Sequence, residues 1–486
     1  KAVRMTMPGC PRIHGHGHPI KDIKDSLRNP TDERVFALYE AIRDGWSTER
    51  IVKHAHIDPW FISQLRIIAR IGEDLSSAGT EQQSEIPQSA RSTGKKLLPG
   101  KELLLAAKQA GFSDEQIAQC VGSREDKIRA LRLELSIRPV SKSIDSTGGE
   151  STVRHGGLYM TYSGVSDDVK ALGAGAMVLG SGPFHIGSNL EYEWCCASAL
   201  KTIRAAGKPA IVLNCNPEAV STDFDIADRV YFEELSLERV CDVYDAERPE
   251  GIILSMGGQI PNNLAIPLSR RGIPVLGTQP ADIDRAEDRN KFSALLDQLG
   301  IQQPEWMEVS SLEAARQFTE KNGFPLLIRP SYVSSGAAMS VAWDDASLKG
   351  LLSRAMKVSP DHPVILTRYA ENSKEIEIDA VANKGEILAY AISEHIENAG
   401  VHSGDATVVL PAQRIYLSTA QAIKKAARKI AAALEITGPF NIQFLAKSTN
   451  IQVIECNLRA SRSLPFCSKV FHIDMAALAV KAQLGL

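Results

Sequence analysis

Three polar side chains near the carboxyl end of the chain, Gln443, Glu455 and Asn457, have the types and spacing of a site for a hard metal ion. Residues 440–459 read as two short apolar strands joined by a polar turn. In a hairpin centred on Thr449, Gln443 lies opposite Glu455, and Asn457 projects from the same sheet face as Glu455. One carboxylate and two amide oxygens suit Mg²⁺ held beside phosphates. The competing interpretation is an ordinary polar sheet edge.

Arginines and a histidine accompany these oxygen ligands. Arg459 and Arg462 follow the second strand, where guanidinium groups can meet anionic oxygens. Arg329 ends an apolar run and precedes a Ser-Ser-Gly loop at 334–336, whose backbone N–H groups could bind phosphate. The alternative there is a plain hairpin with one surface arginine. His402 lies in a Gly–Ser loop and could contact phosphate, although a lone histidine in such a loop is more often structural.

These residues need a scaffold, and the middle of the chain predicts a parallel sheet. Three short continuous apolar runs, separated by helical stretches, are residues 176–179, 210–213 and 252–254. That pattern is typical of parallel strands covered on both faces. Gly180, Asn214 and the 257–259 segment follow the three runs, so a substrate crevice is expected there. NAD binding is disfavoured, because the glycine spacing is wrong and Asn214 replaces the acid that would bind ribose.

The first part of the chain predicts helices. Within residues 29–138, Thr31 is expected to cap one helix and Pro59 to begin another. The segment 113–116 has the spacing of a capping box. Residues 74–96 are rich in Ser, Gln, Thr and Gly and read as a flexible link.

Bulk properties exclude several classes of function. The chain has 486 residues, enough for two to four domains, and a net charge of −3, which gives no drive toward nucleic acid or anionic membrane. No apolar run is long enough to span a membrane. The eight cysteines show no metal-type spacing. Several lie in apolar segments and are expected to be reduced core residues, which predicts an intracellular compartment. The pattern of residues 102–135 resembles a helix-turn-helix motif, but their mixed charges disfavour DNA binding.

Several strings occur together and in order in one family. From about residue 176 onward the chain closely resembles the second synthetase half of the large subunit of carbamoyl-phosphate synthetase. The strings include Gly180-Ser-Gly-Pro183, Asn214-Cys-Asn-Pro217, Asp284-Arg-Ala-Glu-Asp-Arg289, Arg329-Pro-Ser-Tyr-Val333 and Glu455-Cys-Asn-Leu-Arg459. The helical segment resembles the family's oligomerisation domain through Asn29-Pro-Thr-Asp-Glu-Arg34 and Ile57-Asp-Pro-Trp-Phe61.

The resemblance implies an α/β fold class: an α+β ATP-grasp domain behind a Rossmann-like pre-ATP-grasp domain, both preceded by an all-α helical domain. The expected organisation is a flexible leader at 1–28, a helical oligomerisation domain at 29–140, a linker at 141–170, a pre-ATP-grasp domain at 171–288 and an ATP-grasp domain at 289–486.

The resemblance also assigns the site residues. It implies that ATP is bound by Arg289, Arg329, Arg368, Ala370, Glu375, Gly400, Val401, His402, Ser403, Gln443 and Glu455. Gln443, Glu455 and Asn457 would hold Mg²⁺ or Mn²⁺, with K⁺ as a further candidate ion. Arg459 and Arg462, with Arg329, would be the catalytic arginines and face phosphate or carbamate.

The implied reaction is the phosphorylation of carbamate by ATP to carbamoyl phosphate. The implied partners are a first synthetase half, a glutaminase subunit or domain, and further copies bound through the helical domain. Because the chain carries neither the first half nor a glutaminase, we expect partial activity, namely ATP synthesis from ADP and carbamoyl phosphate without bicarbonate. Arginine and pyrimidine biosynthesis, and mitochondrion and cytoplasm, stay open. The rivals are another ATP-grasp carboxylate ligase and a truncated docking partner without full activity.

Overall fold

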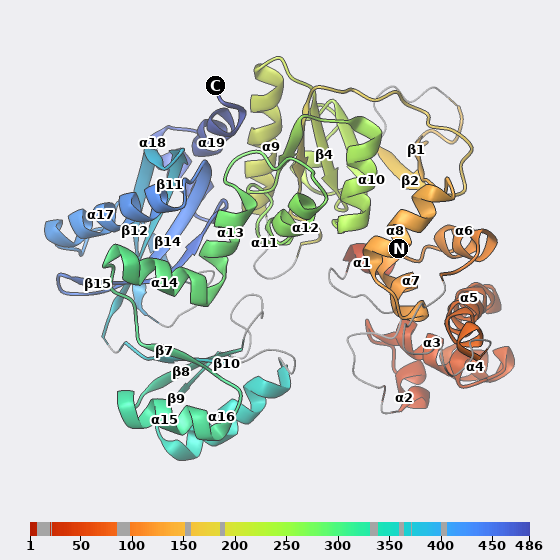
Figure 1. The fold of residues 1–486 in the computed structure, drawn as a ribbon, viewed down its shortest axis with the longest axis horizontal. Coiled ribbons are helices and arrows are strands. Elements are labelled where there is room, and N and C mark those ends of the chain that lie inside the picture. The colour runs from red at the N-terminus through yellow and green to blue at the C-terminus, as the bar shows by residue number, and fades with distance from the viewer. Residues whose placement is uncertain are drawn as a thin grey trace. The chain divides into compact units, whose positions relative to one another are not determined.

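The computed structural model describes residues 1–6, 20, 22–84, 98–150, 157–184, 190–330, 339–358, 364–370, 372–399 and 406–486. They form two compact units (Figure 1). The first comprises Lys1–Ala171 and Tyr231–Glu247, and the second Leu172–Val230 and Arg248–Leu486. None of the helices within these described ranges is long and apolar enough to cross a membrane.

The first unit is mainly helical. Its helices are α1 (Ala2–Thr6), α2 (Ile23–Arg28), α3 (Arg34–Arg43), α4 (Thr48–Ala55), α5 (Pro59–Ser84), α6 (Lys101–Gln109), α7 (Asp114–Val121), α8 (Glu125–Glu134) and α10 (Leu237–Glu247). One apolar cluster joins α2, α3, α4 and the start of α5, and a second joins the later turns of α5 to α6, α7 and α8. Because α1 and α2 lie within residues 1–28, the prediction of an irregular leader is wrong for those two segments.

Some of the predicted helix starts and caps are confirmed, and others are wrong. The start of α5 at Pro59 is confirmed, and so is the capping box of α7, in which Ser113 and Gln116 bond each other's backbone N–H. Thr31 is not a helix cap: its hydroxyl accepts from the Glu33 N–H, and α3 begins three residues later. The flexible link predicted at 74–96 is wrong for 74–84, where α5 continues. Residues 85–97 lie outside the described residues.

The first unit also contains strands where a linker at 141–170 was predicted. β1 (Val140–Ser143) pairs antiparallel with β2 (Leu158–Thr161), and Leu158 of β2 pairs in parallel with Tyr231. Tyr231 belongs to β5 (Arg229–Phe232), a strand through which the division between the units runs.

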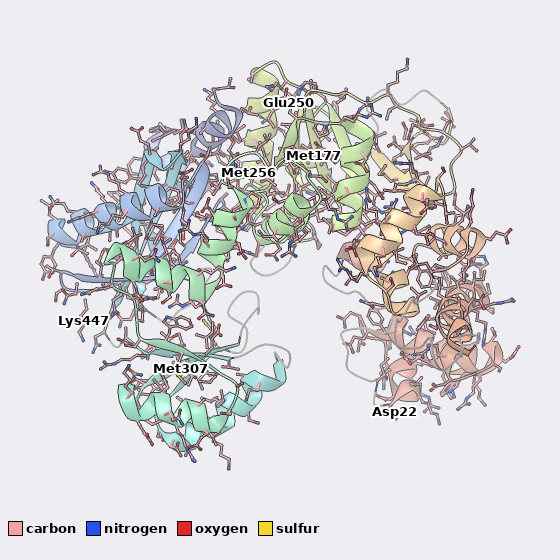
Figure 2. The ribbon with its side chains drawn as sticks, in the orientation of Figure 1. Asp22, Met177, Glu250, Met256, Met307 and Lys447 are labelled. Carbon is pink, nitrogen blue, oxygen red and sulfur yellow. The ribbon has the colours of Figure 1, made fainter. Side chains whose placement is uncertain are left out.

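The second unit begins with the predicted parallel sheet. β3 (Ala176–Leu179) lies between β4 (Ala210–Asn214) and β6 (Gly251–Ile253), and both pairings are parallel, which confirms the prediction. All residues of the three strands are buried. Met177 of β3 and Met256, just after β6, lie in this core (Figure 2). The helices of this part are α9 (Leu190–Ala205), which packs on β3 and β4, the short η2 (Val220–Thr222), α11 (Gln259–Asn262), α12 (Ala265–Arg270) and α13 (Pro280–Glu287).

A four-stranded antiparallel sheet follows α14 (Arg289–Leu299), with the strand order β7-β10-β8-β9. Its strands are β7 (Trp306–Val309), β8 (Leu326–Pro330), β9 (Ser340–Ala342) and β10 (Val364–Arg368). The helices α15 (Leu312–Asn322) and α16 (Asp345–Val358) cover one face and enclose an apolar core with the sheet (Figure 1).

A five-stranded antiparallel sheet completes the second unit, with the strand order β13-β12-β11-β14-β15. Its strands are β11 (Lys374–Asn383), β12 (Glu386–Asn398), β13 (Val408–Val409), β14 (Gly438–Lys447) and β15 (Asn450–Asn457), and its helices are α17 (Leu417–Ala433), α18 (Leu464–Phe471) and α19 (Met475–Leu484). The buried face of α17 is apolar: Ile423, Ala427 and Ile430 are fully buried, and Leu434 is buried just beyond its end.

Candidate active site

The hairpin of β14 and β15 places Gln443 directly opposite Glu455, as predicted. Counting back from the Lys447–Asn450 pair at the turn, a regular ladder would set Gln443 opposite Ile454. A β-bulge after Gln443 adds one residue to β15 and restores the Glu455 pairing. The predicted pair is therefore confirmed, although it depends on an irregularity that the sequence pattern does not show.

Glu455 is the charged centre of this patch. Asn457 Nδ2 donates to its Oε1 at 3.0 Å, and Arg329 Nη2 of β8 lies 3.5 Å from its Oε2. Burial alone would raise the pKa of Glu455, but Arg329, the Asn457 bond and two further arginines lower it below its usual value. The carboxylate therefore stays ionised at neutral pH, which is the form that binds a metal ion. The Arg329 contact also joins the four-stranded sheet to the five-stranded sheet.

Arg289, the first residue of α14, lies on the same patch. Its guanidinium donates to the Ile454 carbonyl and lies over the Trp306 ring, 5.3 Å from its centroid. Burial and the neighbouring charge of Arg329 lower the pKa of Arg289 to about 10, although Glu455 opposes this shift. Two guanidinium groups thus repel each other beside one carboxylate. An anion bound between them would relieve that repulsion.

The deeper side of the patch carries an acidic row, which we define as Glu375, Glu377 and Asp379 of β11. Alternate residues of a strand share one face, so the three carboxylates point the same way. Gln443 Nε2 donates to Glu377 Oε1 at 3.2 Å, a bond that leaves its carbonyl oxygen to bind other groups. Asn441 Nδ2 bridges the row, 3.1 Å from Glu377 and 3.0 Å from Asp379.

His395 of β12 is the basic partner of the acidic row. Its Nε2 lies 3.0 Å from Glu377 Oε1, and its Nδ1 lies 3.9 Å from Glu375 Oε2. Burial would lower the pKa of His395, but the hydrogen bond and charge of Glu377 raise it above the usual value. Burial, with the charges of Glu377 and Glu455, raises the pKa of Glu375 to about 7. Glu375, Glu377 and His395 each offer a ligand atom within 4.8 Å of the others, so they could also hold a cation.

Arg459 links the hairpin to the parallel sheet. Its Nε donates to Gln259 Oε1 at 2.9 Å, and its Nη2 donates to Asn457 Oδ1 at 3.3 Å. Gln259 follows β6, so one of the predicted strand-end segments does reach the site. Gly180 and Asn214 instead pack together beside Glu193: Asn214 accepts from the Gly182 N–H at 3.2 Å and donates to Glu193 at 2.9 Å.

For the remaining predicted site residues, the position in the chain and the burial are as follows. Arg368 ends β10 with an exposed side chain, and Ala370 is half-buried just beyond it. Arg462 is half-buried between two serines that bond into the core. Gly400, Val401, His402 and Ser403 lie outside the described residues.

Sequence reasoning passed over Glu377, Asp379, His395 and Asn441. The signal for the two acids was present: the Glu-Ile-Glu-Ile-Asp run from Glu375 alternates acidic and apolar residues, which puts three carboxylates on one strand face. Asn441 had the same signal, because it is two residues before Gln443. The pairing of His395 with this row depends on the order of β12, β11 and β14, which the sequence pattern does not give.

Three protein-family models match the chain in succession. They are the carbamoyl-phosphate synthetase large chain oligomerisation domain at residues 1–136, the carbamoyl phosphate synthase preATP-grasp domain at 173–285 and the carbamoyl-phosphate synthase L chain ATP binding domain at 288–486. The chain belongs to the carbamoyl-phosphate synthetase large-chain family. It contains an ATP-grasp ligase domain, a pre-ATP-grasp domain and the family's helical oligomerisation domain.

Two relatives show how similar the chain is to known members of the family and how much of their length it covers. The chain is 47% identical over 467 residues to the multifunctional protein pyr-3 of Neurospora crassa, which covers 96% of this chain and 25% of that protein. It is 46% identical over 464 residues to the mitochondrial carbamoyl-phosphate synthase [ammonia] of Rattus norvegicus, covering 96% of this chain and 30% of that protein. The chain thus spans less than a third of the length of these relatives.

A solved structure shows the same fold at low sequence identity. The biotin carboxylase domain of Hydrogenobacter thermophilus 2-oxoglutarate carboxylase superposes with a TM-score of 0.54 and 17% identity, covering 64% of this chain and 70% of that chain. This likeness supports the ATP-grasp fold.

Proposed function

We propose that this chain phosphorylates carbamate with ATP to give carbamoyl phosphate, acting as the second synthetase half of carbamoyl-phosphate synthetase. The observation that carries the proposal is the patch around Glu455. Oxygen atoms of the kind that bind a metal ion lie there beside the guanidinium groups of Arg289 and Arg329, whose positive charge exceeds the single negative charge of Glu455. The order of the three matched regions, with the oligomerisation domain first, supports the second half.

The donor set fits a hard divalent ion. Glu455 is ionised, Asn457 is hydrogen-bonded to it, and Gln443 lies directly opposite in the hairpin. These three side chains would hold Mg²⁺ or Mn²⁺, and the bound ion would neutralise charge on the phosphates. K⁺ stays a further candidate ion, and Glu375, Glu377 and His395 offer three ligand atoms within 4.8 Å of one another. The biotin carboxylase domain of similar fold was solved with MgADP and bicarbonate.

The arginines of the chain would supply positioning and charge neutralisation. Arg289 and Arg329 would bind the phosphates of ATP. Arg368, Ala370 and Glu375 would line the ATP site with residues 400–403, which lie outside the described residues. Arg459 and Arg462 would face the transferred phosphoryl group or carbamate. The carbamate oxygen attacks the γ-phosphorus in line as the bond to the β-phosphate oxygen breaks, and the arginines offset charge on the equatorial oxygens. The bonds of Arg459 to Gln259 and Asn457 preorganise its guanidinium group, which limits the cost of aligning it.

The wider setting is also part of the proposal. We infer that the chain works with a first synthetase half that makes carbamate, with a glutaminase that supplies ammonia, and as an oligomer through its helical domain. The matched oligomerisation domain supports the last point. The free cysteines among the described residues support an intracellular setting, in mitochondrion or cytoplasm.

The test is the partial reverse reaction, which needs only this half. The purified chain is incubated with MgADP and carbamoyl phosphate without bicarbonate, and ATP is measured by luciferase. We expect ATP from the wild type, at least a hundredfold less from Glu455→Gln, and wild-type yield from Glu320→Gln, an exposed carboxylate on α15. A folded wild-type chain that binds MgADP but forms no ATP would refute the proposed reaction.

A further inference from the structure

Asp379, the innermost carboxylate of the acidic row, is surrounded by uncharged donors. Its side chain is 1% exposed. Asn441 Nδ2 and the Ser461 hydroxyl donate to Oδ1, the former at 3.0 Å, while the Ser463 hydroxyl donates to Oδ2 at 2.7 Å. Cys467 Sγ lies 3.6 Å from Oδ2. A buried carboxylate is costly unless hydrogen bonds satisfy it, so this arrangement needs a reason.

Two of the donors come from one short segment, residues 458–463, which we call the arginine segment because it carries Arg459 and Arg462. The two serine hydroxyls also lie 3.0 Å from each other, and Ser461 Oγ accepts from the Leu464 N–H at 3.1 Å. The carboxylate thus holds both ends of a turn that leads from β15 into α18. A fourth contact fixes the segment from the other side, where the Ala460 N–H donates to the Ser255 carbonyl at 2.7 Å.

The pattern of burial separates the anchors from the arginines. Leu458, Ala460 and Ser461 are buried, whereas Arg459 and Arg462 are only half-buried. Arg459 then extends to Gln259 and Asn457, beside the candidate metal ligands. The buried residues of the segment and its hydrogen bonds to Asp379 therefore fix the position of the backbone that carries the two guanidinium groups.

Burial and the charge of Glu377 raise the pKa of Asp379, and the hydrogen bonds from Ser461, Ser463 and Asn441 oppose that rise. A carboxylate accepts through two oxygens, whereas asparagine accepts through one and presents an N–H₂ group at the other position. The anchoring by Asp379 should therefore weaken stepwise as the serine hydroxyls or the second oxygen are removed.

We propose that Asp379 is a positioning residue for the phosphoryl transfer: it fixes the arginine segment through Ser461 and Ser463 and so sets the places of Arg459 and Arg462. This inference rests on the proposed function for its catalytic consequence. The anchoring itself is independent of that function and is measured separately.

The first experiment measures the anchoring on the unliganded full chain. Amide hydrogen exchange of peptides that contain residues 458–463 is compared among wild type, Ser463→Ala, Ser463→Thr and Asp379→Asn. We expect exchange of the segment to rise at least tenfold in S463A and D379N and to stay near wild type in S463T, which keeps the hydroxyl. The control is Ser393→Ala on β12, a buried serine whose hydroxyl has no hydrogen-bond partner within the described residues.

The second experiment measures the catalytic consequence with the reverse reaction. We expect S463A to raise the KM for carbamoyl phosphate about tenfold, with the KM for MgADP changed less than twofold and S463T near wild type. A merely structural role would lower the amount of active enzyme and leave both KM values unchanged.

The outcomes separate the two hypotheses. Unchanged exchange of the arginine segment in both S463A and D379N would overturn the positioning role, whatever the activity. If D379N does not fold, S463A and S463T still decide the question by the same peptide. A wild-type chain without reverse activity would refute the proposed function and the catalytic consequence, while the exchange data would still support or refute the anchoring.

Discussion

Charge balance at single residues explains much of the candidate site. Glu455 is kept ionised by Arg329, Asn457, Arg459 and Arg289, while the pKa of Arg289 falls because it is buried next to a second guanidinium. The patch therefore has a carboxylate ready for a cation and arginines ready for an anion. A nucleotide bound through a divalent ion supplies both at once.

Glu375 makes a residue-scale prediction about pH. Its pKa in the folded chain is about 7, above the usual value of 4.5, so the folded state holds a proton that the unfolded state releases. Stability from this group is therefore complete below about pH 4.5 and is lost as the pH rises through 7. Glu375→Gln has no such loss. We expect its free energy of unfolding, relative to wild type, to increase by about 2 kcal/mol between pH 5 and pH 8.

Urea unfolding of both chains at several pH values checks this prediction. The matched control is Glu397→Gln on the neighbouring β12, where the carboxylate is exposed and its pKa is lowered by hydrogen bonds to its own backbone and to Thr407. The control should show no such gain over the same range. A constant difference between Glu375→Gln and wild type from pH 5 to pH 8 would contradict the assignment.

At the scale of elements, the sequence predicts best where one local signal decides the outcome. Proline starts α5, a capping box starts α7, and continuous apolar runs form β3, β4 and β6. It fails where packing overrides composition: the polar residues 74–84 continue α5, whose earlier turns are buried against α3. The end of a helix that tertiary contacts extend cannot be read from propensity alone.

The hairpin of the site shows the same limit more sharply. Its strands and the Gln443–Glu455 pair were predicted. The turn pairs Lys447 with Asn450 and so is not centred on Thr449, and the bulge that restores the Gln443–Glu455 pair was not predicted. A one-residue slip of this kind would turn every later side chain of β15 to the opposite face, including Asn457. The contact of the acidic row with the arginine segment was missed because it joins β11 to residues about 80 positions later in the chain.

The hairpin turn gives an element-scale prediction. Ser448 has φ 55°, a left-handed backbone conformation that costs a residue with a side chain about 1 kcal/mol. Ser448→Gly should therefore stabilise the chain by roughly 0.5–1 kcal/mol and leave MgADP binding unchanged. Thr449→Gly is the matched control, because Thr449 is not among the residues with positive φ and glycine there should destabilise by a similar amount. Thermal unfolding measures both, and a destabilising Ser448→Gly would be the contrary result.

At the scale of the whole molecule, a buried charge cluster holds the first unit together. We define it as Lys108, Asp114, Arg129, Arg132, Glu238 and Asp242, all buried. Arg132 bonds Asp114 at 2.7 Å and Asp242 at 2.8 Å, and Lys108 bonds Asp114 at 2.8 Å and Glu238 at 2.7 Å. The cluster ties α6, α7 and α8 to α10, a helix within the range matched by the preATP-grasp model. The sequence does not reveal it, because its charges look like solvated helix faces and its partners on α10 lie over 100 residues away in the chain.

This cluster predicts a large effect from one arginine and a small effect from another. Arg132→Met leaves two buried carboxylates short of a partner and should destabilise the chain by about 3–5 kcal/mol. Arg124→Met is the matched control, because Arg124 forms an ion pair with Asp126 of the same length, 2.7 Å, on the exposed surface. It should change the free energy of unfolding by less than about 1 kcal/mol. Equal effects of the two substitutions in urea unfolding would mean that the cluster adds nothing beyond a surface ion pair.

Magnesium-dependent binding of ADP tests the central claim most directly. Calorimetry on the purified chain should show binding of ADP with Mg²⁺, and loss of most of that affinity when EDTA removes the ion. Glu455→Gln should weaken MgADP binding at least about tenfold, because it removes the charged ligand of the proposed set, whereas Glu320→Gln should bind like wild type. Equal affinity with and without the ion, or wild-type affinity in Glu455→Gln, would contradict a nucleotide held through a metal at Gln443, Glu455 and Asn457.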